Sequence, residues 1–372
     1  MIFVKNKKLA FFLAIILSLF ILIGMFFLVK YKNLLIDTKL RVYRNVNFEN
    51  FLQIWDKKKV IFGQKNLIKD TAELNNSVLD NRIISKEEDM IIAVMIENHP
   101  DSRAQMKGLS KASIVYEMLA EGGITRFMAL FSYQDLGLIG PVRSARPYYV
   151  NLAREFSDVY AHAGGSNDAL NLIPNTKLIN LEALYYEGFG KYFYRNKNYY
   201  APHNLFANLN EVKELVKSKM KSKKKYDKSF FQFNDLEDME NLDKASEIEI
   251  NFSYPSFNVV FNYDESDQKY YRFLAGKKHL DSIDGSQIAP SNVVVLLTNY
   301  RTYDSYGRLE YDLIGEGSAM LFRNGRMVPA NWKKSGVLER LKIFDKNAGE
   351  ISFESGQIWI GFINDETKLD FF

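Results

Sequence analysis

Three arginines that could bind an anion stand close together in the sequence. They are Arg126, Arg143 and Arg146. The last two fall in the stretch GPVRSARPYY, residues 140–149, directly after a hydrophobic run. A guanidinium group binds a phosphate or a carboxylate through two parallel hydrogen bonds. The spacing therefore predicts a binding site for a doubly charged anion, and a phosphate or pyrophosphate group is the ligand that we expect.

A predicted helix start beside these arginines should expose backbone N–H groups to the same ligand. Ser144 is expected to cap a helix that continues through YYVNLAREF, with Pro147 in its first turn. Proline suits this position because it lacks the N–H that a first turn leaves unpaired. The remaining unpaired N–H groups and the helix dipole attract anions. The arginines would then flank an anion-binding helix end.

A second turn of the same type follows further along the chain. The stretch HAGGSND leaves an apolar run and enters a predicted helix, with Ser166 or Asn167 as the N-cap. Its candidate ligand-binding residues are His162, Gly164, Gly165, Ser166 and Asp168. Glycines let a backbone approach a ligand closely. The same pattern is equally typical of a plain strand-to-helix turn, with His162 as a buried histidine of the core.

Two glutamates and one more histidine complete the set of candidate ligand-binding residues: Glu117, Glu121 and His203. The glutamates could instead pair with the arginines in structural ion pairs. No metal site is predicted, because the four histidines lie far apart without HxxH or HExxH spacing and the chain has no cysteine. A Mg²⁺ ion that bridges a phosphate needs only one or two carboxylates, so this cofactor stays open.

Alternating strands and helices should position these side chains. The runs IIAVMIEN, ITRFMALFS and DVYAHAGG are expected to be strands, and SKASIVYEMLAEG, RPYYVNLAREF and SNDALNLI are expected to be helices. From Glu247 onward the runs are strand-like, and Asn324-Gly325 between two of them predicts a hairpin. The predicted fold class is α+β, with an α/β layered domain followed by a mostly antiparallel β domain. Ligands are expected at the carboxyl ends of the strands of the first domain.

An uncharged apolar run precedes these domains. Residues 9–29 would span roughly 30 Å as a helix, the thickness of a bilayer core, so a transmembrane helix is expected. Basic residues on both sides leave its orientation open. The predicted organisation is a cytoplasmic tip (1–8), a transmembrane helix (9–29), a stalk (30–85), an α/β ligand-binding domain (86–213), a charged linker (214–245) and a β-rich C-terminal domain (246–372).

Composition excludes several classes of function. The 372 residues carry a net charge of +4, which is too small to indicate nucleic-acid binding. The absence of cysteine excludes disulfides, zinc thiolate sites, cysteine nucleophiles and the lipid-attachment cysteine of a lipoprotein. Aromatic residues make up 14 % of the chain, which favours extensive sheet or interface.

A series of motifs links the sequence to a known family. They are NHPDSR, GLSKASIVYEMLAEGGITRF, IGPVRSARPYY, HAGGSNDA, APHNLF, NVVVLL, GEGSAMLFRNGR, NWKK and ESGQIWI. Over roughly residues 88–372 they resemble the YerB-like family of bacterial lipoproteins, whose two domains are of unknown function. The sequence departs from the family where the lipobox cysteine is missing, at Ala104 in place of proline and at Ser113 in place of aspartate.

The family resemblance implies an envelope protein with its large domains outside the cytoplasmic membrane, and it implies no activity. A weaker similarity suggests one. TRFMALF, IGPVRSAR and HAGGSNDAL are similar in order and spacing to motifs of the LytR-CpsA-Psr phosphotransferases, which hold a polyprenyl pyrophosphate. On that similarity the three arginines would bind the pyrophosphate. Phe127 and Ser144 stand where those enzymes have the aspartates that reach Mg²⁺.

The sequence thus favours a single-pass, extracytoplasmic membrane protein that binds an anionic cell-wall-related ligand. Its expected partners are the membrane, a polyprenyl-phosphate-linked or other anionic envelope ligand, and envelope proteins. One alternative is a non-enzymatic scaffold that acts through protein contacts of the β domain. The other is a LytR-CpsA-Psr-like glycopolymer phosphotransferase, so the sequence leaves open whether the protein is an enzyme.

Overall fold

The computed structural model describes residues 90–132, 137–219 and 242–372. All of them belong to one compact unit. The predicted cytoplasmic tip, transmembrane helix and stalk lie outside the described residues. Within the described ranges, none of the helices combines the length and the apolar character needed to cross a membrane.

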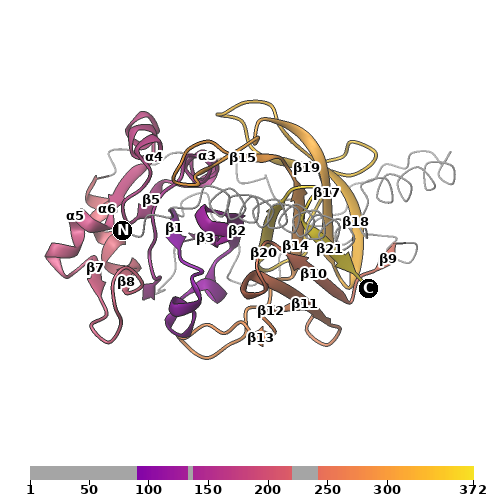
Figure 1. Cartoon of the computed structure of the whole chain (residues 1–372), viewed down its shortest axis with the longest axis horizontal. Helices are drawn as coiled ribbons and strands as arrows, with labels where there is room; N and C mark the ends of the chain where they lie inside the picture. Colours follow the sequence, from indigo (N-terminus) through magenta and orange to yellow (C-terminus); the bar gives the residue numbers. More distant parts are fainter. Residues whose placement is uncertain (1–89, 133–136, 220–241) are drawn as a thin grey trace, which may run out of the picture. The chain divides into compact units, whose positions relative to one another are not determined.

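A mixed sheet of eleven strands runs through this unit (Figure 1). The strand order is β19, β18, β17, β14, β20, β2, β3, β1, β5 and β6, with β9 paired to β18. The strands are β1 (Ile91–Ile96), β2 (Ile114–Leu119), β3 (Thr125–Ser132), β5 (Val159–His162), β6 (Ile179–Glu182), β9 (Asp243–Lys244), β14 (Asn292–Leu297), β17 (Gly315–Arg323), β18 (Arg326–Lys334), β19 (Lys342–Phe344) and β20 (Ile358–Ile363). Strands β1, β5 and β6 are parallel, whereas β3 is antiparallel to both β1 and β2.

The strands at the centre of this sheet are buried on both faces, which explains their continuous apolar sequences. The prediction of a helix over SKASIVYEMLAEG was wrong, because Ile114–Leu119 forms β2. All six residues of this segment are buried. Strand β2 lies between β3 and β20, so both of its faces and both of its edges are covered. A helix with one apolar face could not fill that position.

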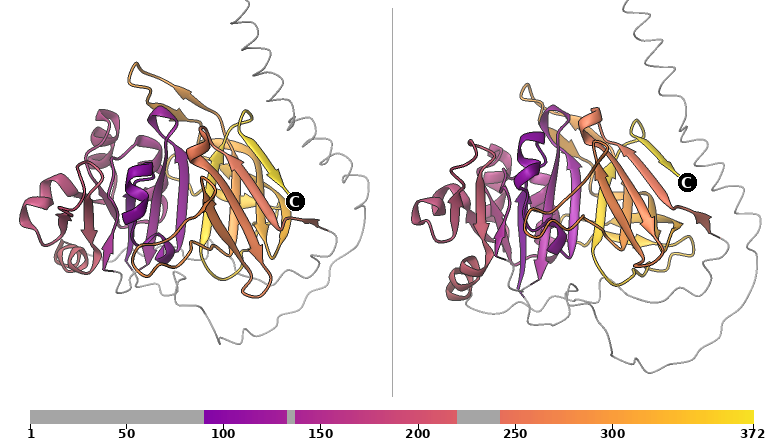
Figure 2. Two further views of the ribbon diagram at one scale, coloured as in Figure 1. Left: turned by 60° about the horizontal axis from the view of Figure 1, so that its bottom comes forward. Right: turned by 90° about the horizontal axis from the view of Figure 1, so that it is seen from below.

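A smaller sheet of five strands packs against the large one (Figure 2). Its strands are β13 (Lys277–Lys278), β12 (Lys269–Leu274), β11 (Asn258–Asp264), β10 (Glu247–Asn251) and β21 (Lys368–Phe371). Buried and half-buried side chains alternate along β10 and β12, as expected for a sheet with one covered face. Phe261 of this sheet meets Trp359 of β20 edge to face, with ring centroids 6.0 Å apart.

Helices and small sheets complete the fold. The helices are α3 (Pro147–Phe156), α4 (Asn167–Leu172), α5 (Ala183–Tyr186) and α6 (Leu209–Lys219), with short 3₁₀ turns η1 (Pro100–Gln105) and η3 (Glu121–Gly123). A three-stranded sheet contains β4 (Leu138–Ile139), β8 (Leu205–Asn208) and β7 (Phe193–Arg195), and a hairpin contains β15 (Tyr300–Thr302) and β16 (Leu309–Tyr311). The helices predicted at RPYYVNLAREF and SNDALNLI are confirmed as α3 and α4. The predicted Asn324-Gly325 turn is confirmed between β17 and β18, with positive φ at both residues.

The predicted α+β class is confirmed, and both predicted domains contribute strands to one sheet. Strand β2 of the first pairs in parallel with β20 of the second, with Ile114 beside Ile358. The domain boundaries stay a prediction, and most of the predicted linker 214–245 lies outside the described residues.

A buried ion pair joins the large sheet to the five-stranded sheet. Arg272 Nη2 of β12 donates to both carboxylate oxygens of Glu117 in β2, at 3.0 and 2.9 Å. Trp359 Nε1 donates to the same carboxylate at 3.0 Å, and Thr125 Oγ1 donates to it at 2.9 Å. Neither Glu117 nor Arg272 is exposed. Desolvating both charges is costly, so their mutual attraction and these hydrogen bonds must offset that cost.

Arg272 also determines the state of a buried histidine. Its Nη1 donates to Nδ1 of His279. Burial and the charge of Arg272 hold the pKa of His279 well below its usual range. His279 is therefore neutral and acts as a hydrogen-bond acceptor in this network.

We predict that replacing Arg272 strongly destabilises the protein. The substitution Arg272→Met leaves the Glu117 carboxylate buried without its cation, which should lower the free energy of unfolding by about 3–5 kcal/mol. Urea denaturation at pH 7 measures this. The control Arg301→Ala removes an exposed arginine paired with Glu310 and should leave the free energy nearly unchanged. A similarly small effect of both substitutions would contradict the assignment.

We also predict that cutting the chain between its two parts does not separate them. A specific protease site introduced within residues 220–241 would divide the chain before β9. Because β2 pairs with β20 and Glu117 pairs with Arg272, the two fragments should elute together from a size-exclusion column. They should separate in denaturant. Separation under native conditions would show that each part is stable without the shared sheet.

Candidate functional site

One edge of the large sheet gathers most of the predicted site residues. The parallel strands β1, β5 and β6 end there, and β3, which runs the other way, begins there. Glu97 follows β1, Arg126 stands at the start of β3, and Glu121 lies in the turn η3 between β2 and β3. The structure thus places these residues at the carboxyl ends of β1 and β2 and at the start of β3, and ligand binding at this edge stays a prediction.

The two predicted turn motifs run side by side at this edge. Arg143 N donates to Met95 O at 2.9 Å, and Ala163 N donates to Arg143 O at 3.0 Å. Ala145 N then donates to Gly164 O at 2.9 Å. A Cβ on Gly165 would lie 3.2 Å from the Cβ of Ala145, so the close approach of the two segments favours glycine. Residues 143–145 therefore extend the sheet edge between the segments that follow β1 and β5.

The predicted helix start needs one correction. The N-cap of α3 is Arg146, not Ser144, and no side chain caps this helix end. Pro147 is confirmed in the first turn. Ser144 lies two residues before this N-cap, and its backbone carbonyl accepts a hydrogen bond from Arg126 Nη1 at 3.1 Å. The N-cap of α4 is Ser166, as one of the two predicted alternatives, and its side chain accepts from Ala169 N.

Each of the three arginines faces a carboxylate at this edge. Arg146 binds Glu121 through two hydrogen bonds, from Nε to Oε1 and, at 2.7 Å, from Nη2 to Oε2. Arg126 Nη2 lies 3.7 Å from the same carboxylate. Arg143 Nε lies 3.0 Å from Oε1 of Glu97, which is almost completely buried. We call Arg126, Arg143 and Arg146 the arginine cluster.

The electrostatics of the cluster show crowding of positive charge. Burial lowers the pKa of Arg126, and the charge of Arg146 lowers it further, while Glu121 opposes both. Burial alone would raise the pKa of Glu121, but the hydrogen bond from Arg146 and the charges of both arginines make the net pKa lower than usual. Glu121 is therefore an ionised counter-ion that two guanidinium groups share.

Other predicted site residues have partners of their own. His162 is fully buried, and its ring nitrogens lie 2.8 Å from Gly164 O and from Asn180 Oδ1, as in the core-histidine alternative. Asp168 is exposed and accepts a hydrogen bond from Tyr303 Oη at 2.8 Å. Glu117 is not brought to the arginine cluster, because it lies in the buried pair with Arg272. The roles of these residues in ligand binding stay predictions.

His203 does reach the cluster, through a residue that the sequence-based reasoning missed. Its Nδ1 lies 2.9 Å from Oε2 of Glu97, whose other oxygen faces Arg143. The ring of His203 stacks on that of His99, with centroids 4.7 Å apart. The two histidines are far apart in the sequence, and only the fold brings them together. The motifs NHPDSR and APHNLF contain the two histidines, but nothing local shows that they meet.

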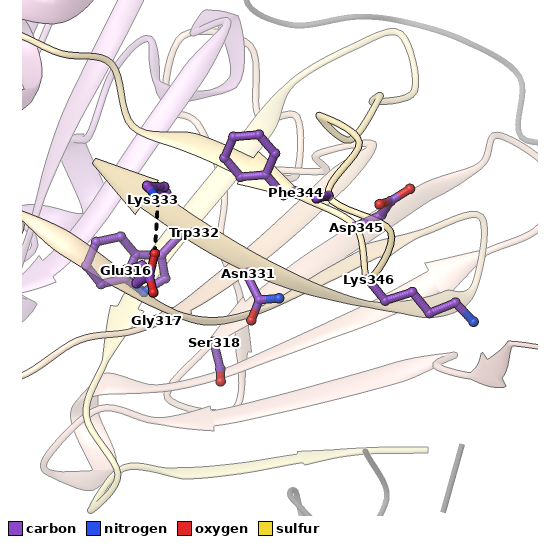
Figure 3. A pocket seen from close by; sticks show the side chains of 10 residues that line it. Glu316, Gly317, Ser318, Asn331, Trp332, Lys333, Phe344, Asp345 and Lys346 are labelled. Atoms are coloured by element: carbon purple, nitrogen blue, oxygen red, sulfur yellow. Dashed lines mark ion pairs between the residues drawn. The ribbon is translucent and has the colours of Figure 1, made fainter. Parts of the chain in front are cut away.

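A pocket of about 590 Å³ lies apart from these residues, on strands β17, β18 and β19 (Figure 3). Trp332, Phe344 and Lys333 are among its lining residues. Trp332 is nearly buried, and its Nε1 donates to Leu297 O at 2.7 Å. Lys333 pairs with Glu316 at 3.2 Å. The Trp332 hydrogen bond and the Lys333–Glu316 ion pair thus connect β18 to β14 and β17 of the same sheet.

Fold and site together define an α+β protein in which two sequence domains share one mixed sheet with a charged edge. The chain belongs to a family described as protein of unknown function DUF3048. Residues 81–225 match its N-terminal domain and residues 248–360 match its C-terminal domain. This confirms the resemblance found in the motifs.

The relatives agree with this assignment. The chain is 31 % identical over 310 residues to "Putative lipoprotein YerB" of Bacillus subtilis (strain 168). The aligned region covers 81 % of this chain and 90 % of the relative. The crystal structure of YerB from Bacillus subtilis superposes with a TM-score of 0.67 at 29 % identity, over 77 % of this chain and 96 % of that chain. Neither comparison names an activity.

A second buried ion pair holds the far end of α3, the helix that begins directly after Arg146. Lys334 Nζ of β18 donates to Glu155 Oε1 of α3 at 2.6 Å, and Leu341 N donates to Glu155 Oε2 at 3.0 Å. Burial raises the pKa of Glu155 from its ordinary 4.5 to about 6, although Lys334 opposes the rise. The helix that begins after Arg146 is therefore fastened to the second predicted domain.

We predict a pH dependence of stability from this carboxyl group. Because its folded pKa is the higher one, protonation stabilises the folded state below pH 4.5, and this contribution is lost as the pH rises through 6. A pKa raised from 4.5 to about 6 corresponds to about 2 kcal/mol. Urea denaturation gives the free energy of unfolding of the native protein and of Glu155→Gln. The difference between these two free energies should change by about this amount between pH 4.5 and 6.5. Parallel curves would contradict the prediction.

Proposed function

We propose that the protein is a membrane-anchored cell-envelope protein that binds an anionic, phosphate- or pyrophosphate-bearing, cell-wall-related ligand at the arginine cluster. The observation that carries this proposal is a charge imbalance. Among the described residues, the three guanidinium groups share two carboxylates, those of Glu97 and Glu121. The excess positive charge lies at a largely buried site, where an uncompensated charge is costly. An anion would compensate it.

The cluster also remains accessible enough to meet a ligand. The side chains of Arg143, Arg146 and Glu121 are 25 %, 12 % and 22 % exposed. Guanidinium groups bind phosphate oxygens through charge-assisted hydrogen bonds, which are stronger than neutral ones. An incoming phosphate would compete with Glu121 for the hydrogen bonds of Arg146. Arg126 could interact with both the phosphate and Glu121.

The envelope location is supported by the relative and by the composition of this chain. The name of the Bacillus subtilis relative describes a lipoprotein. This chain has no cysteine to carry a lipid, and the apolar run at residues 9–29 would take the place of the lipid anchor. In this proposal the described unit lies outside the cytoplasmic membrane.

A scaffold is the second candidate function, and one observation favours it. Every arginine of the cluster already has a carboxylate within 3.7 Å, as structural ion pairs would. The phosphotransferase alternative has less support. Phe127 stands where those enzymes have an aspartate for Mg²⁺, and it is fully buried against Trp359.

Replacing Arg146 separates ligand binding from the scaffold function. A charge-assisted hydrogen bond contributes roughly 1.5–3 kcal/mol, so Arg146→Ala should weaken the binding of inorganic pyrophosphate by about tenfold or more. Isothermal titration calorimetry on the full-length protein measures this. The control Arg326→Ala removes a half-buried arginine of β18 that donates to Leu242 O, and binding should not change. Unchanged affinity in Arg146→Ala together with a lower melting temperature would favour the scaffold.

A further inference from the structure

The geometry points to a binding site for a divalent transition-metal ion, of which Zn²⁺ is the best example, formed by His99, Asp101 and His203. One ligand atom from each residue lies within 4.8 Å of the other two. His99 Nδ1 and Asp101 Oδ2 are 3.6 Å apart. Ligand atoms on one tetrahedral Zn²⁺, with bonds of about 2.0–2.2 Å, lie about 3.3–3.6 Å apart. The three residues thus stand near ligand spacing, and side-chain rotations that turn the two stacked rings toward one ion would close the site.

Hydrogen bonds leave a lone pair on each histidine. A carboxylate only accepts hydrogen bonds, so His203 Nδ1, 2.9 Å from Glu97 Oε2, carries the proton and Nε2 carries the lone pair. Asp101 N donates to His99 Nδ1 at 3.3 Å, so this nitrogen carries the lone pair of His99. A metal ion at Nδ1 would replace this long hydrogen bond. A neutral imidazole, which offers one lone pair in the plane of the ring, is the form that binds a metal.

Glu97 supports His203 as carboxylates support the histidine ligands of many protein metal sites. Histidine ligands commonly donate their second N–H to a carboxylate, which orients the ring and raises its basicity. Glu97 has this position and is only 3 % exposed. Gln105, itself buried, donates from Nε2 to the backbone carbonyl of His203 and holds this loop in place. His99 caps η1 with its side chain, and the ring of His203 lies beside it.

The ligand set determines which ions fit. Two imidazoles and one carboxylate suit Zn²⁺ and its first-row neighbours, whereas Mg²⁺ prefers oxygen ligands throughout. Three protein ligands leave a coordination position open for water or another ligand. The side chain of Asp101 is 75 % exposed, so that position would face solvent. This site involves none of the three arginines as a ligand, and it does not depend on the function proposed above.

Titration of the full-length protein with metal ions alone tests the site. After dialysis against EDTA, Zn²⁺ should bind saturably in calorimetry and raise the melting temperature, because an ion that binds only the folded state stabilises it. Co²⁺ should give the visible absorption of a four-coordinate ion. Equal binding of Mg²⁺, or no saturable binding of Zn²⁺, would overturn the proposal.

Variants locate the ion. Asp101→Asn and His203→Gln should each weaken Zn²⁺ binding at least tenfold, and Glu97→Gln, which changes no ligand, should weaken it about 10- to 100-fold. The control Asp365→Asn, an exposed aspartate before β21, should bind like the native protein. Because Asp101 is exposed, Asp101→Asn should keep the native melting temperature in EDTA. Native Zn²⁺ affinity in the Asp101 and His203 variants would place the ion elsewhere and overturn the proposal.

Discussion

The buried pair between Glu117 and Arg272 is the constraint on which the rest of the structure depends. Neither side chain reaches solvent, and each comes from a different family domain. A buried charge without its partner costs several kcal/mol, so neither domain can bury its half of this pair alone. The pair can therefore form only where the two domains meet, and there they share one sheet, with β2 directly beside β20.

The same pair is connected to the charged edge of the sheet. Thr125 donates to Glu117, and Asn98 Nδ2 donates to Thr125 Oγ1 at 2.7 Å. Arg103 Nε in turn donates to Asn98 Oδ1 at 3.2 Å. This series of hydrogen bonds fixes the start of β3, where Arg126 lies, and the end of β1, which Glu97 follows. A site built on such elements is held in place before any ligand arrives.

Glu97 is the residue shared by the two proposed sites. Its carboxylate faces Arg143 with one oxygen and His203 with the other. An anion that draws Arg143 away would leave Glu97 to His203 alone, whereas a metal on His203 would strengthen the interaction between His203 and Glu97. The two proposed sites are therefore coupled electrostatically through Glu97. Each rests on its own observations and is tested by its own variants.

Local sequence determined those features that depend on neighbouring residues. Pro147 predicts a helix start, Asn324-Gly325 predicts a hairpin, and continuous apolar runs predict buried strands, because backbone preference and side-chain period act over a few residues. The arginines and the HAGGSND turn were also predicted to lie near one another, and the structure places them at the same edge of the sheet. Tertiary structure decided the rest.

Three features could not be read from the sequence. Ile114–Leu119 is a strand because β3 and β20 cover both of its edges, and the residues of β20 lie far away in the chain. Glu117 belongs to the core and not to the site because its partner Arg272 comes from the second domain. His99 and His203 meet because the segment after β1 and the loop between β7 and β8 reach the same sheet edge. Such pairings are set by strand order, which no local pattern encodes.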